Sequence, residues 1–324
     1  MVENEQLYKN AILAAERVMD EVKKVVKGKD DCIRKAFAAI LAGGHILIED
    51  VPGVGKTTLA MAFSKTMKLD NHRVQFTPDV LPADILGFSM YNKETGKFSY
   101  HPGAVVCNLF LADEINRTSP KTQSALLEVM EEGMVTVDGV SRAVPSPFIV
   151  IATQNPKGSA GTQLLPESQL DRFMICISMG YPDMESEIEI AKGKTKAIDY
   201  DQIYPVMDAQ GLESLKRVVE EVFVHDNIYK YMVKLVDATR KNDYIELGIS
   251  PRGLIALARM TKATAFLNHR NYVVPEDVED VFLDVTRHRI LLNTKARVTR
   301  VSGEAVLQKI LDEIEKPTFF KEKG

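Results

Sequence analysis

The chain has 324 residues, of which 45% are hydrophobic and 27% are charged, and its net charge is −4. This length exceeds what one small hydrophobic core needs, so we expect two domains in an ordinary globular protein. The slight acidity argues against a nucleic-acid-binding protein with a wholly basic surface.

The cysteines and the N-terminus indicate where the protein works. Cys32, Cys107 and Cys176 are far apart and show no C-x-x-C spacing, which is typical of reduced, buried thiols. The first residues lack the basic and apolar regions of a signal peptide, and no apolar run approaches ~18 residues. The sequence therefore predicts a cytoplasmic location and no membrane span.

The first half of the chain has the pattern of an α/β fold. Apolar residues recur at helical spacing over 5–27, and a second predicted helix over about 30–42 ends at two glycines. Five short apolar runs follow, at 45–49, 73–76, 108–112, 148–153 and 173–178. Nearly unbroken apolar runs are typical of strands buried on both faces of a parallel sheet, and helical stretches separate most of them.

The pattern changes after Pro182, where only helices are predicted. One of them has Ser250 as its N-cap and a proline at its first position. We therefore expect an α/β nucleotide-binding core over 1–182, a linker over 183–204 and an all-helical domain over 205–324.

The stretch IEDVPGVGKTTLA, residues 48–60, nearly matches the phosphate-binding pattern G-x-x-x-x-G-K-S/T. Lys56 can reach the β- and γ-phosphates of a nucleotide and Thr57 can bind Mg²⁺, while backbone N–H groups at the start of the following helix surround the phosphates. The residues expected to contact nucleotide are Pro52, Gly53, Val54, Gly55, Lys56, Thr57 and Thr58. A glycine-rich turn with a helical lysine is the alternative.

Asp50 occupies the position of the first glycine in this pattern. It sits where the strand ends, before the backbone donors begin. We therefore expect its carboxylate to point away from phosphate, towards a backbone N–H or a cation such as Lys29.

An acidic pair, Asp113 and Glu114, ends the third predicted strand. Asp113 can hold the Mg²⁺ shell and Glu114 can orient the attacking water. Such a pair is often only a solvated turn, but its place about 55 residues after the phosphate loop favours a catalytic role, since ligands bind at this edge of a parallel sheet.

Three further polar residues have candidate roles, each with an alternative. Asn155 follows the fourth predicted strand, where it can act near the γ-phosphate or simply form a turn. Arg172 precedes the fifth strand and can stabilise the transition state or pair with a nearby acid. Arg252 lies in the first turn of a helix, where a cation calls for an anionic partner, either a carboxylate or a phosphate.

With these elements in this order, the sequence resembles the AAA+ ATPases, and the residues of its individual motifs resemble those of the MoxR family. The most specific strings are VPGVGKT, LADEINR, ATQNP, LPESQLDRF and SPRGL, and the resemblance runs from about 15 to 315. It implies an αβα core with a five-stranded parallel sheet, a helical lid, and a homo-oligomer, usually a hexameric ring, that hydrolyses ATP to ADP with Mg²⁺.

The resemblance also implies roles for single residues. It assigns Lys56 and Thr57 to Walker A, Asp113 and Glu114 to Walker B, Asn155 to sensor 1, Arg172 to the arginine finger of a neighbouring subunit and Arg252 to sensor 2. Arg117 is implied to face the neighbour's site, and Val26, Lys27 and Gly28 fall where the family lines its adenine pocket.

Two insertions of the family match residues 79–103 and 134–144. The residues of the second segment predict a hairpin independently of the resemblance, because valines alternate around an Asp138-Gly139 turn. A hairpin here can contact a substrate in the ring pore or only brace the sheet.

Three classes of function follow. A chaperone-like ATPase acting on a protein client, implied to carry a von Willebrand factor A domain, is favoured. A nucleic-acid motor has only the basic stretch 287–300 in its support, and we do not expect a nucleic-acid partner. A nucleotide sensor that does not hydrolyse ATP would have no need of Glu114.

Overall fold

The computed structural model of the chain describes residues 2–50, 53–94, 96–155, 165–181, 184–192 and 199–318. Its centre is a five-stranded parallel sheet with the strand order β2-β5-β8-β1-β9. The strands are β1 (Ile46–Glu49), β2 (Asn71–Gln75), β5 (Leu109–Asp113), β8 (Ile149–Gln154) and β9 (Ile175–Ile177). These are the five strands that the apolar runs predict, so the α/β fold class is confirmed.

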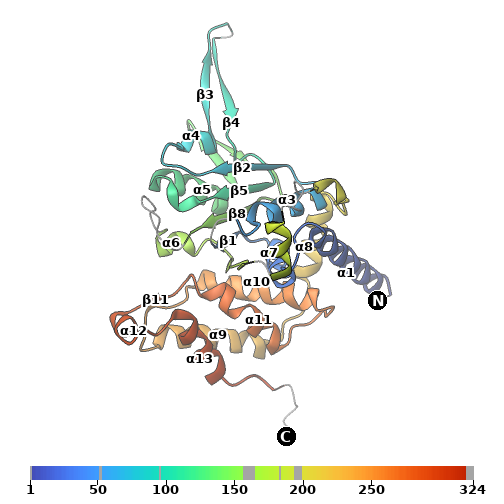
Figure 1. Cartoon of the computed structure of the whole chain (residues 1–324), viewed down its shortest axis with the longest axis vertical. Coiled ribbons are helices and arrows are strands. Elements are labelled where there is room, and N and C mark those ends of the chain that lie inside the picture. Colours follow the sequence, from blue (N-terminus) through green and yellow to red (C-terminus); the bar gives the residue numbers. More distant parts are fainter. Residues whose placement is uncertain are drawn as a thin grey trace.

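The sheet is covered on both faces because side chains alternate along each strand. In β1, Ile46 and Ile48 belong to one hydrophobic cluster and Leu47 belongs to the other. The first cluster contains residues of α1 (Val2–Lys23), α2 (Asp30–Leu41) and α3 (Lys56–Thr66), whereas the second contains residues of α5 (Pro120–Glu132). The result is a three-layer αβα arrangement (Figure 1).

Helices dominate the C-terminal part of the chain, as predicted. They are α8 (Ala209–Glu220), α9 (Asp226–Lys241), α10 (Pro251–Leu267), α11 (Pro275–Thr286), α12 (Thr294–Thr299) and α13 (Gly303–Glu313). A short antiparallel pair, β10 (Ile245–Leu247) and β11 (Leu291–Leu292), adds to them, and strands of two or three residues are too short for a periodic pattern to reveal. We call this part of the chain the lid.

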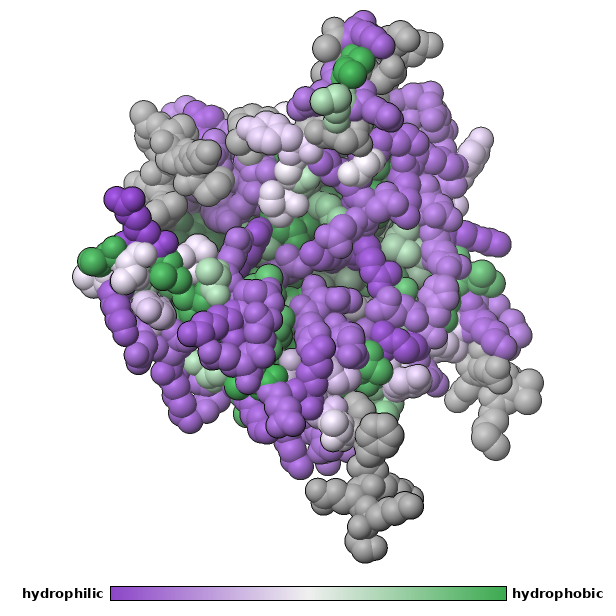
Figure 2. All heavy atoms as spheres, turned by 60° about the horizontal axis from the view of Figure 1, so that its bottom comes forward, coloured by the Kyte–Doolittle hydropathy of each residue, from purple (hydrophilic) through white to green (hydrophobic). Residues whose placement is uncertain are grey.

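The lid packs directly against the α/β layers. One continuous hydrophobic cluster includes Phe37 of α2 and Phe266 of α10, and Tyr8 of α1 meets the Phe266 ring edge-on at 5.5 Å between centroids. The division at 182 and 204 therefore remains a prediction. The face of the molecule that the lid forms is mostly hydrophilic, with small separate apolar groups, as for a surface in contact with water (Figure 2).

Both expected insertions contain antiparallel hairpins. In the predicted one, β6 (Met134–Val137) pairs with β7 (Val140–Ala143), and Asp138 and Gly139 have φ of 52° and 74°. Two positive φ angles suit a tight turn that follows the twist of the strands, so this hairpin is confirmed. The other joins β3 (Gly87–Asn92) to β4 (Lys97–Pro102) and projects from the sheet (Figure 1).

The described residues form the remaining short elements α4 (Pro82–Leu86), η1 (Ile115–Arg117), α6 (Glu167–Leu170), α7 (Met184–Ala191) and η2 (Tyr200–Gln202). Cys32, Cys107 and Cys176 are buried and unpaired, and burial raises the pKa of Cys32 and Cys107 to about 12. In the described part of the chain, every helix is too short or too polar to cross a bilayer.

Candidate functional site

The loop after β1 leads into α3 through Gly55, which has φ of 95° and caps the helix. This left-handed conformation favours glycine, and the free N–H groups of the first helical turn then face the loop. A hollow lies over this turn, which we call the phosphate hollow. It is lined by Gly53, Gly55, Lys56, Thr57, Thr58, Arg73, Gln75, Asp113, Glu114 and Thr153. Pro52 lies outside the described residues.

Asp50 points away from this hollow. Its carboxylate accepts hydrogen bonds from the Ser178 hydroxyl at 3.0 Å, from the Gly180 N–H at 3.2 Å and from the Met179 N–H. The expected orientation towards backbone N–H groups is confirmed, whereas Lys29 donates to the Gly180 carbonyl. Asp50 therefore ties the end of β1 to the end of β9.

Lys56 reaches back over the loop and donates to the Asp50 carbonyl at 2.9 Å. Burial lowers the pKa of Lys56, and the carboxylates of Asp50, Asp113 and Glu114 oppose that effect. The ammonium group therefore lies close to three negative charges. A phosphate that enters the hollow would compete with these carboxylates for the ammonium group.

The carboxylate of Asp113, at the end of β5, is held on both oxygens. Thr153 of β8 donates its hydroxyl to Oδ1 at 2.9 Å, and the same hydroxyl accepts from the Glu114 N–H at 2.9 Å. Arg73 of β2 donates to Oδ2 from Nε at 2.9 Å and from Nη2 at 2.8 Å. Adjacent strands thus fix the acidic pair at the carboxyl edge of the sheet.

Glu114 has φ of 56° and ψ of 49°, which is uncommon for a residue with a side chain. This conformation turns its carboxylate towards Gln75 of β2, which donates to it at 2.9 Å, and towards Arg117, which donates at 2.7 Å. Arg117 thus pairs with Glu114 of its own chain in this structure, and its implied place at a neighbour's site stays a prediction.

Arg73 and Gln75 are two further residues of this site, beyond those that the sequence motifs indicate. Both lie on β2, whose Gln75 pairs in register with Asp113, so they share the edge on which the acidic pair lies. The polar positions in the run RVQF were the available signal, because a strand buried on both faces carries few polar residues.

The donors in the phosphate hollow suit a hard cation. The Thr57 hydroxyl and the Asp113 carboxylate line the same hollow, and Mg²⁺ prefers oxygen ligands and usually keeps water and phosphate ligands besides one or two protein groups. The described residues contain no cluster of three or more His, Cys, Asp or Glu side chains able to hold a metal alone. A nucleotide-bound Mg²⁺ is therefore the metal that fits.

The remaining nucleotide-side residues lie near this edge without lining the hollow. Asn155 follows β8, and its carbonyl accepts from the Asn116 side chain at 3.3 Å. Val26 is buried, and Gly28 has φ of 66°, in the connection between α1 and α2 that also contains Lys27. The adenine pocket assigned to these three residues stays a prediction.

Arg172 and Arg252 lie at the opposite edge of the sheet. Both line a second hollow, which we call the arginine hollow, together with the glycines that precede β1 and with Arg259 of α10. The phosphate loop follows β1, whereas this hollow precedes it, so the length of a four-residue strand, roughly 13 Å, separates the two. The structure therefore brings the two arginines together and keeps them apart from their own phosphate hollow.

The two arginines share Glu131 near the end of α5. Arg172 Nη2 lies 3.1 Å from Glu131 Oε2, and Arg252 Nη2 contacts Oε1 of the same carboxylate. Arg172 also donates from Nη1 to the Leu127 carbonyl at 2.5 Å, while its Nε is buried without an acceptor. Arg172 therefore retains unused hydrogen-bonding capacity.

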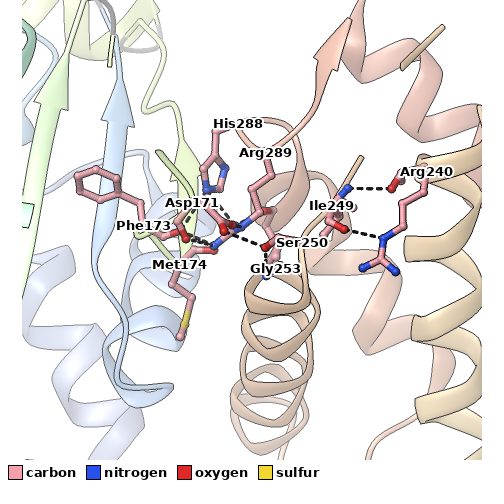
Figure 3. Close-up of polar contacts among 11 residues, drawn as sticks. Asp171, Phe173, Met174, Arg240, Ile249, Ser250, Gly253, His288 and Arg289 are labelled. Carbon is pink, nitrogen blue, oxygen red and sulfur yellow. Dashed lines mark hydrogen bonds and ion pairs between the residues drawn. The ribbon is translucent and has the colours of Figure 1, made fainter. Parts of the chain in front are cut away.

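Arg289 and Ser250 of the lid form buried polar contacts with Asp171, which precedes strand β9 of the sheet (Figure 3). We call this set of contacts the joint. Arg289 donates from Nε to Asp171 at 2.8 Å and from its other nitrogens to the Phe173 carbonyl at 2.5 Å and the Met174 carbonyl at 3.0 Å. The Ser250 hydroxyl donates to the second Asp171 oxygen at 2.8 Å. Asp171 directly precedes Arg172, and Ser250 caps the helix that carries Arg252. The joint therefore fixes, relative to each other, the two backbone segments that carry these arginines.

The matches to known proteins agree with this geometry. Residues 45–175 match the family described as the ATPase family associated with various cellular activities (AAA), and residues 237–310 match the AAA lid domain.

The relatives match over almost the whole chain. The chain is 44% identical to the uncharacterized protein YeaC of Bacillus subtilis strain 168, over 93% of this chain and 94% of that protein. It is 38% identical to Chaperone MoxR1 of Mycobacterium tuberculosis, over 93% of this chain and 82% of that protein. A crystal structure of a candidate ATPase from Cytophaga hutchinsonii ATCC 33406 is 40% identical, with a TM-score of 0.88 over 98% of each chain.

Proposed function

The chain belongs to the MoxR family of AAA+ ATPases, and we propose that it hydrolyses ATP at sites shared between neighbouring subunits of a homo-oligomeric ring. One observation carries the proposal. Lys56, Thr57, Asp113 and Glu114 converge at one edge of the sheet, whereas Arg172 and Arg252 lie together at the other. A head-to-tail ring places one edge of each subunit against the opposite edge of the next, which would complete the site.

In this proposal each residue near the phosphate hollow has a definite task. Lys56 and the N–H groups from Gly53 to Thr58 bind the β- and γ-phosphates. Thr57 and Asp113 would hold Mg²⁺, which would neutralise phosphate charge. Glu114 orients a water and accepts its proton as the oxygen attacks the γ-phosphorus. The bond to the bridging oxygen then breaks, and ADP and phosphate leave.

The arginines act on the neighbour's nucleotide. Arg172 and Arg252 stabilise the charge that develops on the transferring phosphoryl group of the adjacent subunit. This assigns Arg252 to the same interface as Arg172, because the joint at Asp171 keeps both on one side of the subunit. Asn155 completes the site near the attacking water, and Val26, Lys27 and Gly28 contact the base.

The work done by hydrolysis is proposed from the relatives. Chaperone MoxR1 is named as a chaperone, so we propose that this chain remodels a protein client in a chaperone-like way. The client class to test first is proteins with a von Willebrand factor A domain. We further propose that the active form is a cytoplasmic ring of six subunits, each with a core at 1–182, a linker at 183–204 and a lid at 205–324. The projecting β3–β4 hairpin, with Phe88 and Phe98 at least half exposed, offers a surface for such a client.

The basic stretch 287–300 gives little support to a nucleic-acid motor. Arg289 is buried in the joint with Asp171, Arg287 bonds to the Cys176 sulfur, and Lys295 pairs with Asp243. Arg287 and Arg289 are engaged within the fold and are not available to neutralise nucleic-acid phosphates, so only the exposed Lys295, Arg297 and Arg300 of this stretch remain for that role. A filter-binding assay at low and high salt tests this directly.

A subunit-mixing experiment tests the shared site. Arg172→Ala and Lys56→Ala should each abolish most turnover alone. Mixed rings should regain activity at about a quarter of their interfaces, because half of the subunits carry the intact lysine and half the intact arginine. Lys56→Ala mixed with the double variant Lys56→Ala/Arg172→Ala should regain none. Absence of recovery in rings shown to be mixed would refute a shared site.

A further inference from the structure

The pair of neighbour-facing arginines has a shared counter-ion in its own chain. Resting on the function proposed above, we infer that Glu131 is a positioning residue for ATP hydrolysis. It holds Arg172 and Arg252 together as one unit that faces the next subunit, and it does not itself touch the nucleotide.

The contacts show a division of one carboxylate between two cations. Glu131 Oε2 lies 3.1 Å from Arg172 Nη2, and Oε1 contacts Arg252 Nη2. The side chains of Glu131, Arg172 and Arg252 are 35%, 28% and 43% exposed, so the cluster is partly covered and only partly screened by water. Two guanidinium groups this close repel each other unless an anion lies between them.

Other contacts of the arginines do not replace this carboxylate. Arg172 otherwise donates to the backbone carbonyl of Leu127, and its buried Nε has no acceptor. Arg252 lies in the first turn of α10, where the partial positive charge of the helix end disfavours a cation. Glu131 therefore offsets both the mutual repulsion and the unfavourable helix position.

The cluster remains suited to an anion that approaches from outside. Two guanidinium groups and one carboxylate leave one net positive charge. Arg259, two turns after Arg252 on α10, lines the same hollow, is exposed, and has no hydrogen-bonding or ion-pair partner within the described residues. A phosphate of the neighbouring subunit's nucleotide would meet a preassembled cationic surface, which reduces the reorganisation needed during the reaction.

The test is Glu131→Gln, which removes the charge and keeps the shape of the side chain. We expect kcat to fall about tenfold or more, because small misplacements of groups that act on the transition state are costly. KM for ATP should stay within about threefold of the parent, because the phosphate hollow lies at the other edge of the sheet. Glu132→Gln is the matched control. Glu132 is the next residue, is exposed, and forms no side-chain hydrogen bond or ion pair within the described part of the chain, so its variant should keep parental kcat.

A double-variant cycle separates positioning from a structural effect. In an Arg252→Ala background, Glu131→Gln should lower kcat by no more than about threefold further, because residues that act as a unit are not additive. A structural role would instead multiply the two losses and lower the melting temperature. Unchanged or raised kcat in Glu131→Gln, or multiplied losses in the cycle, would overturn the inference.

The outcomes also distinguish this inference from the proposed function. Loss of turnover in Arg172→Ala and Arg252→Ala, with parental turnover in Glu131→Gln, would overturn the role of Glu131 and leave the shared site standing. Parental turnover in all three variants would overturn both.

Discussion

Arg289 of the lid donates to the carboxylate of Asp171 over 2.8 Å, and this ion pair is the buried link between the lid and the loop that carries Arg172. Arg289 is only 4% exposed, and burial lowers its pKa while Asp171 opposes that effect. The adjacent carbonyls of Phe173 and Met174 also accept from Arg289. A single side chain therefore satisfies one carboxylate and the backbone around it.

Arg289→Met should destabilise the protein by about 3–5 kcal/mol, because it leaves Asp171 charged and unpaired in a mostly buried place. Arg289→Lys keeps the charge but loses the planar set of donors, so we expect an intermediate loss of about 1–3 kcal/mol. Denaturant unfolding measures both. Arg297 of α12 is exposed and its side chain contacts no polar partner among the described residues, so Arg297→Met should change stability by less than about 0.5 kcal/mol. Stability of Arg289→Met within the range of this control would contradict the role of the joint.

Glu114→Gln should bind ATP and hydrolyse it very slowly. The amide cannot accept the proton of the attacking water, and such a general base contributes roughly 100- to 10,000-fold in rate, or about 3–5 kcal/mol of barrier. Equilibrium binding and steady-state phosphate release measure the two effects separately. Glu128→Gln, at an exposed position of α5, is the control. Turnover of Glu114→Gln within threefold of the parent would assign the water to another residue.

The sequence predicted the features that depend on local pattern. The five strands, the Asp138-Gly139 hairpin and the orientation of Asp50 follow from apolar runs, from turn residues and from the position of a residue before the phosphate loop. In each case the information lies within a few neighbouring residues, so periodicity and turn chemistry suffice.

The contacts that join the arginines could not be predicted in this way. Glu131 meets Arg252 across 121 positions of sequence, and Arg289 meets Asp171 across 118. An arginine at a helix N-terminus indicates an anionic partner but does not identify it, and the sequence left both carboxylate and phosphate open for Arg252. In this structure the partner is the carboxylate of Glu131.

Because His45 is buried in its neutral form, we expect the free energy of unfolding to fall as the pH is lowered below about 6.5. Its Nδ1 accepts from the Val150 N–H at 3.0 Å and its Nε2 donates to the Met130 carbonyl at 3.0 Å, so the ring is buried neutral and its pKa is lowered to about 4. The unfolded chain takes up the proton below about pH 6.5, whereas the folded chain does so only near pH 4.

The contribution of His45 to stability is thus complete above pH 6.5 and is lost as the pH falls towards 4. Between pH 7.5 and pH 5.0 this amounts to about 2 kcal/mol. Unfolding by denaturant at both pH values, in the parent and in His45→Gln, measures it. The parent should lose about 2 kcal/mol more than the variant, and equal losses would show that another group titrates.

Asp50→Gly should leave ATP affinity within about tenfold of the parent, because the carboxylate faces Ser178, Met179 and Gly180 and not the phosphate hollow. A carboxylate about 4 Å from a phosphate would oppose binding by about 4 kcal/mol at an effective dielectric of 20, or roughly a thousandfold in affinity. The variant should instead lose about 1–3 kcal/mol of stability, since two backbone N–H groups lose their acceptor, and Asp50→Asn should lose less. Lys56→Ala is the contrasting variant and should nearly abolish ATP binding in the same calorimetric assay. A hundredfold tightening in Asp50→Gly would show that the carboxylate turns towards phosphate when nucleotide is bound.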